Sequence, residues 1–372
     1  MNKLVHTLIV SILLSLGLAS TARAADEQAT VGLQVEPVGT LYQEAFRPAR
    51  WELSTLISTS TPTIYPLRVA DIGMGPNVRF NPDPDMPVCP DSEVGPDVNL
   101  SAPVATIVAR CPQSVLGNGT ALFQLAGVNA PNYQLPGYMV IFNGGRDAQG
   151  HPQIKIYAYS YATGVAIYTT SALIDGQLSF AVPRLSYDSA VTSMNLSIPG
   201  EEIPITDPAA PPGLTVPAGQ DPNYAQARCP GDSWALSGQF LLGNRDSAGQ
   251  PVPPETTISA EDSLACQGQA GQGKISKPQA SGPGKMKVGA SGKFQIKISN
   301  KGTATAKSLR IKVSGPKVAI SKSVGSLGLN QSKTVTIKVK ARMAGKQSWK
   351  FQVLSSNSAK VATAKKMVVN KR

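Results

Sequence analysis

Histidine is scarce in this 372-residue chain, and so are charged residues in general. The only histidines are His6 and His151, which leaves little room for histidine-dependent catalysis or for a metal site with several histidine ligands. Charged residues make up 16% of the sequence, well below the usual quarter of a soluble domain. Gly-x-Ser-x-Gly, His-Glu-x-x-His and P-loop motifs are absent. We therefore expect a protein that is not an enzyme and that uses no metal and no cofactor.

Acidic residues are missing from the entire C-terminal part of the chain. All 23 Asp and Glu residues lie between Asp26 and Asp262, whereas residues 263–372 hold 23 of the 35 Lys and Arg residues and no acid. Once Lys3 and Arg23 are set aside with the N-terminal 24 residues, 10 basic residues remain beside the 23 acidic ones, a balance of −13. The formal net charge of +12 is thus the sum of −13 from the acidic module, +23 from the tail and +2 from Lys3 and Arg23.

The N-terminus has the pattern of a secretory signal peptide. Lys3 precedes a mostly apolar run from Leu4 to Ala19, and the small residues of Ala22-Arg23-Ala24 follow it. An uncleaved anchor helix is the alternative, but the run is short for a membrane span. No other stretch approaches 18 apolar residues. We expect residues 1–24 to be a signal peptide, with the mature chain secreted, extracellular or associated with the cell surface, and without a transmembrane span.

Four cysteines are present, an even number that indicates disulfides in an exported protein. Three pairings are possible, and we favour Cys89–Cys111 with Cys229–Cys266 because each pair brackets a compact stretch. Closing loops of these lengths contributes about 3–4 kcal/mol each in the chain-entropy model. A zinc site needs close pairs such as Cys-x-x-Cys, and the sequence has none.

Short candidate strands fill residues 25–268, while helix signals are almost absent. Met139–Phe142 and Ile154–Tyr157 flank the glycine-rich residues 143–150, as in a β-hairpin. The other candidate strands are Thr30–Val35, Trp51–Ile57, Tyr65–Ile72, Val104–Val108, Thr120–Leu125, Val165–Thr169, Gln177–Val182, Val191–Ile198 and Ser233–Leu242. The Pro- and Gly-rich residues 200–223 indicate a long surface loop. We expect an all-β fold, with residues 25–268 forming an acidic, disulfide-containing β-sandwich domain.

Residues 269–284 are rich in Gly, Gln, Ser, Pro and Lys, which predicts a flexible linker. Beyond it, apolar residues alternate with lysines, as in Phe294–Ile298, Leu309–Val313, Val335–Val339 and Trp349–Val353. Together with Met286–Val288 and Val361–Val369, these segments give about six strands with one apolar face and one lysine-rich face. Residues 285–372 therefore predict a second, basic β-sandwich without cysteine.

Within residues 292–306 of this second module, a strand ends in Asn300-Lys301-Gly302, a short turn follows, and Ala306 leads into the next strand. In this pattern the module resembles the Ig-like adhesion-type modules of secreted bacterial proteins, the CARDB and related repeat families. Val324–Gly328 followed by Ser332–Val339 fits the later half of that pattern. We expect Gly302 to supply a turn conformation that side chains resist and Asn300 to cap the bend. The resemblance implies a spacer or contact module, with no catalytic residues to transfer.

The acidic module contains Arg79–Pro82 leading to Pro87–Pro90, then Ala109–Cys111 with Val115–Gly119, and near its end Cys229-Pro230, Trp234, Gln239-Phe240 and Cys266. By these features it resembles a family of secreted actinobacterial β-proteins over most of residues 47–266. The stretch between Phe240 and Cys266 is longer than in that family. The resemblance implies a disulfide-stapled β-sandwich and no particular activity.

Several residues can be interpreted either as functional or as structural. His151 follows a glycine in a turn, and we expect a solvated turn residue rather than a base or ligand. Asp83, Asp85, Asp91 and Asp97 are clustered, but their spacing matches no calcium-binding loop, so we expect a solvated acidic loop. The adjacent Glu201 and Glu202 do not make a glycosidase pair. Trp51 and Trp349 are expected in the cores and Trp234 near a disulfide.

Exposed lysines of the second module are the strongest functional candidates. A surface of charge +23 attracts polyanions without base-specific groups, whereas solubility alone, or pairing with the acidic module, would also use lysines. We expect a non-enzymatic structural or adhesive protein whose basic module contacts an anionic envelope or matrix polymer, and no specific nucleic acid. The alternative is a secreted carboxylate-dependent hydrolase with an accessory Ig-like module. The candidate polyanion-binding residues are Lys293, Lys297, Lys312, Lys338, Lys340 and Lys350.

Overall fold

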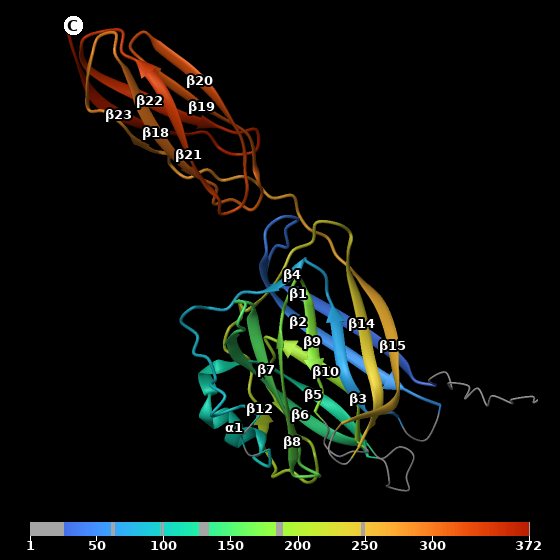
Figure 1. Ribbon diagram of the computed structural model, residues 1–372. Helices are drawn as coiled ribbons and strands as arrows, with labels where there is room; N and C mark the ends of the chain where they lie inside the picture. The colour runs from blue at the N-terminus through green and yellow to red at the C-terminus, as the bar shows by residue number, and fades with distance from the viewer. Residues whose placement is uncertain are drawn as a thin grey trace, which may run out of the picture.

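Two β-domains lie end to end in the computed structural model (Figure 1). The structure describes residues 26–60, 64–96, 98, 100–125, 134–183, 189–246 and 250–371. The strands of one domain fall within residues 28–265, and those of the other within residues 279–370. The all-β fold is confirmed, since one short α-helix and one 3-10 turn are the only helices among these residues. The expected signal peptide, residues 1–24, lies outside the described residues.

The first domain is built on a nine-stranded antiparallel sheet with the order β4-β13-β2-β10-β5-β6-β7-β8, in which β1 pairs with β2. Its strands are β1 (Gln28–Pro37), β2 (Arg47–Ser58), β4 (Val78–Phe80), β5 (Val115–Leu125), β6 (Gln134–Arg146), β7 (Pro152–Ser160), β8 (Val165–Ala172), β10 (Ser189–Ile198) and β13 (Ala225–Ala227). A four-stranded sheet with the order β15-β14-β3-β9 packs against it. These strands are β3 (Leu67–Gly73), β9 (Gln177–Ala181), β14 (Ser233–Arg245) and β15 (Pro251–Ala265).

The main core of this domain lies between the two sheets. Trp51 and Leu53 of β2 face Ile72 of β3 and Phe240 of β14, and all four are buried. Alternate residues of β2 point inward, which explains the alternating pattern of its sequence. Trp51 is a core residue as expected, and Trp234 is buried in the same core as Cys229, with its indole N–H donating to the Arg228 carbonyl at 2.8 Å.

A second apolar cluster covers the outer face of β6 and β7. Met139 and Ile141 of β6 face the main core, whereas Val140 and Phe142 face this outer cluster. Strands that are buried on both faces carry continuous apolar runs, which accounts for the run Met139–Phe142. The cover consists of α1 (Val104–Arg110), the 3-10 turn Pro112–Ser114 and the short hairpin of β11 (Ile203–Pro204) and β12 (Thr215–Val216).

Two sequence predictions in this region are wrong. Val104–Val108 was expected as a strand but lies in α1, because Val104 and Ile107 are three residues apart and both bury on the helix side that faces the cluster. Residues 200–223 were expected as a surface loop, yet they contain the β11–β12 hairpin and bury Ile205 and Val216. In both cases a tertiary contact that local composition does not encode determines the structure.

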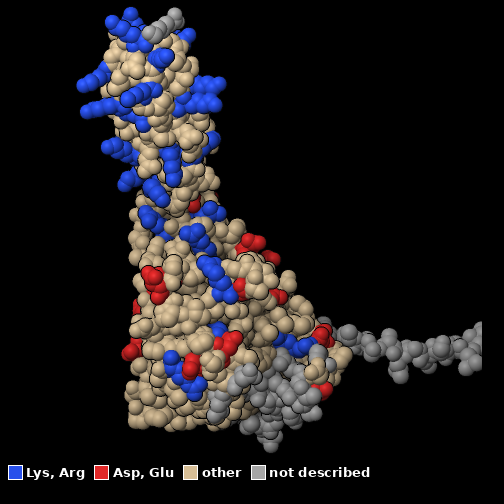
Figure 2. Space-filling model, turned by 60° about the vertical axis from the view of Figure 1, so that its left-hand side comes forward, with Lys and Arg blue, Asp and Glu red and all other residues tan. Residues whose placement is uncertain are grey.

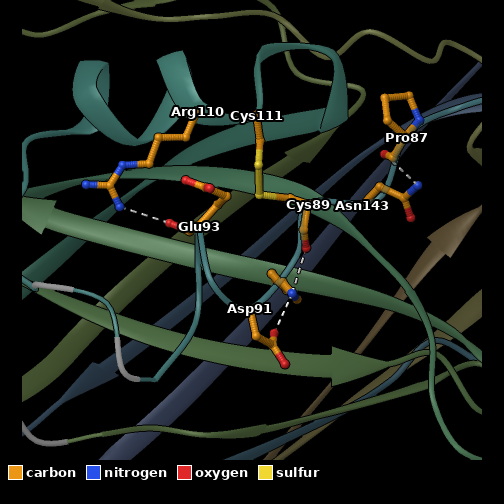
Figure 3. Close-up of a disulfide and its surroundings, with 8 residues drawn as sticks. Pro87, Cys89, Asp91, Glu93, Arg110, Cys111 and Asn143 are labelled. Carbon is orange, nitrogen blue, oxygen red and sulfur yellow. Dashed lines mark hydrogen bonds and ion pairs between the residues drawn. A yellow bond between two sulfur atoms is a disulfide. The ribbon is translucent and has the colours of Figure 1, made fainter.

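The disulfide prediction is confirmed. Cys89 pairs with Cys111 and Cys229 with Cys266, with Cα–Cα distances of 5.6 and 6.1 Å. The first disulfide ties the loop before α1 to its C-terminus, and Arg110 beside it donates to the Glu93 carbonyl at 3.1 Å (Figure 3). The second ties the start of β14 to the end of β15, next to the second domain.

The second domain is a sandwich of a three-stranded sheet, β16-β18-β21, and a five-stranded sheet, β17-β23-β22-β19-β20. Phe294 packs between Trp349 and Phe351 from the opposite sheet, with ring centroids 5.3 and 5.5 Å apart. Trp349 is therefore a core residue as expected. The strands are β16 (Gln279–Ser281), β17 (Lys285–Lys287), β18 (Ser291–Ser299), β19 (Ala306–Gly315), β20 (Val318–Leu327), β21 (Ser332–Lys340), β22 (Gly345–Leu354) and β23 (Val361–Asn370).

Six of these eight strands match the segments expected from alternation, and the other two do not alternate. β20 is an edge strand in which most residues are exposed. β16 falls in the expected linker of residues 269–284, and the structure differs from that expectation. Ile275 is buried in the second core, and β16 pairs with β18, so the second domain begins before residue 285. Pro278 and Pro283 flank β16, a position compatible with an edge strand.

A turn after β18 contacts the first domain. Asn300 is fully buried and its side-chain amide donates to the carbonyls of Ala304 and Leu327 at 2.9 and 3.0 Å, while its oxygen accepts from the Gly302 amide at 3.0 Å. The expected capping role of Asn300 is therefore confirmed. Gly302 is required for a different reason, because a Cβ there would collide with the backbone of Gln272.

Glu44 of the first domain contacts this turn directly. Its Oε2 accepts from the backbone amide of Thr305 at 2.8 Å and from the Thr305 hydroxyl at 2.7 Å. These two hydrogen bonds, helped by the charges of Lys307 and Arg228, hold the pKa of the Glu44 carboxyl below its ordinary value against the opposing effect of burial. One carboxylate of the acidic domain thus docks the basic domain through threonine rather than through an ion pair.

Trp349→Ala should destabilise only the second domain. Truncating a buried aromatic residue costs about 3–5 kcal/mol, and the second core shares no residue with the first. Calorimetry of the full chain should show two unfolding transitions, of which Trp349→Ala lowers one. Phe180→Ala, in the first core, is the matched variant and should lower the other. A single transition that shifts as a whole in both variants would contradict two independent cores.

Glu44→Gln should loosen the joint without unfolding either domain. Because the Glu44 pKa is lowered, the carboxylate contact contributes at pH values above the ordinary carboxyl range and is lost as the pH falls through the lowered pKa. We expect reduced hydrogen-exchange protection of the Thr305 amide in Glu44→Gln at about pH 6, and in the unmodified chain once the pH is brought below the lowered pKa of Glu44. Glu36→Gln, on the exposed end of β1, is the control. Unchanged Thr305 protection in Glu44→Gln would contradict this joint.

Candidate functional site

The lysines expected to bind polyanions are all exposed, and the structure divides them between two faces. Lys293 and Lys297 of β18 lie on the outer face of the three-stranded sheet together with Lys338 and Lys340 of β21. We call these four side chains the lysine face. Lys312 and Lys350 were expected to act with them, but they lie on the outer face of the five-stranded sheet, on the far side of the core.

Strand register determines the spacing within the lysine face. Lys293 lies directly opposite Lys338, and Lys340 follows two residues later on the same side of β21. Directly opposed residues of an antiparallel pair have Cβ atoms about 5 Å apart, and alternate residues of a strand are about 7 Å apart. Like charges at such distances destabilise a sheet. The remaining positions on this face are uncharged polar residues: Gln279, Ser281, Ser291, Gln295, Ser299, Ser332, Thr334 and Thr336.

No acidic residue compensates this charge from within the domain, because the sequence from residue 263 onward contains none. Figure 2 shows the consequence, with blue side chains distributed over the second domain and red ones over the first. The ion pairs between described side chains lie within the first domain, among them Arg50–Glu52, Arg50–Glu201 and Lys155–Asp91. The lysine face therefore carries uncompensated positive charge.

Two other lysines have a structural role instead. Lys322 of β20 donates to the Thr336 carbonyl at 2.9 Å, and Lys333 of β21 donates to the Val324 carbonyl at 3.1 Å. β20 and β21 are edge strands of different sheets, and lysine on an edge strand discourages pairing with another chain. The solubility interpretation of the lysines thus fits these two.

His151 lies in the β6–β7 turn, as expected. Its Nδ1 is 2.9 Å from Oδ2 of Asp147, which also accepts from the His151 backbone amide at 2.7 Å through Oδ1. This local pairing closes the hairpin turn, and no other described side chain forms a hydrogen bond or ion pair with the ring.

Asp91 also has a structural partner. Its carboxylate lies 2.5 Å from Nζ of Lys155, a buried lysine that also donates to the Cys89 carbonyl at 2.7 Å. Figure 3 shows Asp91 below the disulfide with these interactions. Asp83 accepts from the Asp85 amide, and Asp97 lies outside the described residues. Among the residues whose placement is described, no group of three or more His, Cys, Asp or Glu side chains could hold a metal ion.

Glu201 and Glu202 lie at a groove that the sequence did not indicate. Glu52 of β2 lines the same groove, and Arg50 binds both Glu52 and Glu201. The contact between Glu44 and Thr305 was missed as well. In both cases the partners are more than 100 residues apart in sequence, so no local pattern could reveal them.

Residues 277–365 match the family of HYDIN/CFA65/VesB-like Ig-like domains. The Ig-like character expected for the second domain is thus supported, with a domain start closer to residue 277 than to 285. No curated protein matches this chain in sequence. Within the described residues, no helix is long and apolar enough to cross a membrane.

Three solved structures match parts of this chain at low sequence identity and low TM-score. The CARDB domain of a protein from Pyrococcus furiosus is 16% identical, with a TM-score of 0.24 over 27% of this chain and 96% of that chain. The transglutaminase of red sea bream is 10% identical, with a TM-score of 0.24 over 94% of this chain and 32% of its own. The T6 backbone pilin of serotype M6 Streptococcus pyogenes is 10% identical, with a TM-score of 0.25 over 92% of this chain and 52% of its own.

Proposed function

We propose that this protein is a non-enzymatic structural or adhesive protein whose second domain contacts anionic polymers through the lysine face. The observation that carries the proposal is the direct opposition of Lys293 and Lys338 on an exposed sheet in a domain without any acidic residue. Opposed like charges weaken a sheet. Their presence is more readily explained by a ligand that supplies the missing negative charge.

The geometry of the lysine face suits a linear polyanion. The Cβ atoms that carry its lysine side chains are about 5 Å apart across the strands and about 7 Å apart along β21, so several positive charges lie in a row within reach of one polymer chain. The interleaved Gln295 and Thr336 offer hydrogen bonds without adding charge. Such a surface binds by releasing counterions from the polymer, so the affinity falls steeply with salt.

The location of the ion pairs supports contact with an external polymer over neutralisation inside the molecule. They lie within the first domain, and the acidic side chain that reaches the joint, Glu44, bonds to Thr305. The lysine face thus keeps its charge for an external partner. We further propose that this partner belongs to the cell envelope or extracellular matrix, since the signal-peptide pattern and the two disulfides fit an exported protein.

The hydrolase alternative is weakened by how its candidate carboxylates are held. A general acid must carry a proton, whereas Glu52 and Glu201 both accept from the single guanidinium of Arg50. That arrangement is typical of a structural ion-pair network. We therefore assign this region a binding role rather than catalysis.

Neutralising the lysine face should weaken polyanion binding more than removing the same charge elsewhere. A fourfold variant of the lysine face loses four charges through Lys293→Gln, Lys297→Gln, Lys338→Gln and Lys340→Gln. Its matched control loses four exposed charges on the other sheet through Lys312→Gln, Lys346→Gln, Lys350→Gln and Lys366→Gln. Heparin affinity of the full chain should fall at least tenfold further in the first variant, and the slope of log affinity against log salt should decrease by about three to four.

Calorimetric unfolding of both variants checks that each remains folded. Equal losses in the two variants would mean that the charge acts diffusely, and binding that does not depend on salt would rule out the polyanion mechanism.

A further inference from the structure

A polar groove of about 500 Å³ crosses the outer face of the nine-stranded sheet in the first domain. It lies where β1, β2, β10 and β5 run side by side, away from the cluster that covers β6 and β7. The inward residues of these strands, such as Leu33, Leu53 and Leu196, fill the main core. The groove is therefore a separate surface feature and not a packing defect of that core.

Strand register arranges the floor of the groove in two rows of polar side chains. One row runs across four strands as Gln34, Glu52, Ser197 and Asn118. The neighbouring row runs as Ser54, Asn195 and Thr120. At the end of this second row, on β1, Gly32 lies opposite Ser54 and has no side chain. Short side chains over several adjacent strands leave the surface hollow.

The wall of the groove is held in place by one arginine. Arg50 binds Glu52 through Nη2 at 2.5 Å and Glu201 through Nη1 at 2.6 Å, and its Nε donates to the Ser197 hydroxyl at 3.2 Å. Asn118, which is 1% exposed, donates to the backbone carbonyls of Glu201 and Pro217. The segment that carries Glu201 and Glu202 is thus fixed over the end of the sheet, so the groove is preformed.

Several polar groups in the groove are left for a ligand. The side chains of Gln34, Thr120 and Asn195 form no hydrogen bond with another described residue, and Ser54 has only a long bond of 3.4 Å to the Gly32 carbonyl. Amides and hydroxyls both donate and accept hydrogen bonds. Glu52 and Glu201 each bind Arg50 through Oε1, which leaves Oε2 of each as an acceptor. Sugar hydroxyls, which donate and accept at regular intervals, match this set.

The charge of the groove restricts the class of ligand that it can bind. The lining includes the carboxylates of Glu52, Glu201 and Glu202 against the single guanidinium of Arg50, so an acidic ligand would be repelled. None of the described residues that line the groove is aromatic. Recognition therefore depends on hydrogen bonds rather than on stacking, and the polymer bound by the lysine face is not the ligand here.

We propose that this groove binds a short hydroxyl-rich sugar segment that is neutral or carries an amine but has no acid group. The site is independent of the lysine face, which lies in the other domain. A protein with both sites holds an anionic polymer at one end and a non-acidic glycan at the other.

The test uses the full-length protein and isothermal titration with defined oligosaccharides. The probes are neutral hexasaccharides of glucose, mannose, galactose and N-acetylglucosamine, a glucosamine hexamer, an acidic galacturonic acid hexamer and a hexalysine peptide. Asn195→Ala and Thr120→Val remove groups of the floor with little effect on folding, because both side chains lie on the outer face. Thr257→Val, on an exposed position of β15, is the matched control.

We expect at least one neutral or amine-bearing hexasaccharide to bind, with a loss of at least tenfold in Asn195→Ala and Thr120→Val and no change in Thr257→Val. The galacturonic acid hexamer should bind at least tenfold more weakly, and the four-lysine variant of the lysine face should bind the sugar normally. The proposal is overturned if none of the neutral or amine-bearing sugars binds, if hexalysine is the preferred ligand, or if the floor variants leave sugar binding unchanged. Because the lysine face has its own readout with heparin, either proposal can fail alone.

Discussion

Both domains depend on one constraint, which is that each strand must bury one side between two sheets. Trp51 in the first domain and Trp349 in the second occupy these buried sides, and polar residues alternate with them on the outer faces. A binding site can then form only on an outer sheet face that no other segment of the chain covers. In the first domain, α1 and the loop tied by the Cys89–Cys111 disulfide cover the outer face of β6 and β7 and leave that of β1, β2, β10 and β5 open.

The separation of charge follows the same division into outer faces. Acidic side chains of the first domain are partly engaged by its few basic residues, as at Arg50 and Lys155, whereas the second domain has no acid with which to pair. The contact between the domains uses the hydrogen bonds of Glu44 with Thr305, supported by the charge of Lys307, which is not part of the lysine face. Docking by neutral hydrogen-bond donors leaves the positive surface intact, so the joint and the lysine face do not compete for the same groups.

Period-two alternation was a reliable guide wherever a strand has one solvated face. It located six strands of the second domain and the core positions of Phe294 and Trp349. It failed where that condition does not hold. Edge strand β20 fully buries only its ends, Val318 and Leu327, and has no regular alternation between them. β16 is embedded in a linker-like composition, and Val104–Val108 combines β-branched residues with helical spacing. The prediction of a flexible linker at residues 269–284 was wrong because this Gly- and Pro-rich segment packs into the second core through one buried residue, Ile275.

The sequence by itself determined the all-β fold and the presence of exposed lysines, and it favoured the disulfide pairing that the structure has, because each depends on local alternation or on short spacings along the chain. Only the tertiary structure decided which lysines act together. Lys293 and Lys338 are neighbours because β18 pairs with β21 across an intervening hairpin, while Lys312 lies on the opposite sheet. The groove between Glu52 and Glu201 arises in the same way, since hydrogen-bond register across four strands aligns residues that are far apart in sequence. Register results from pairing between distant segments, and no single segment encodes it.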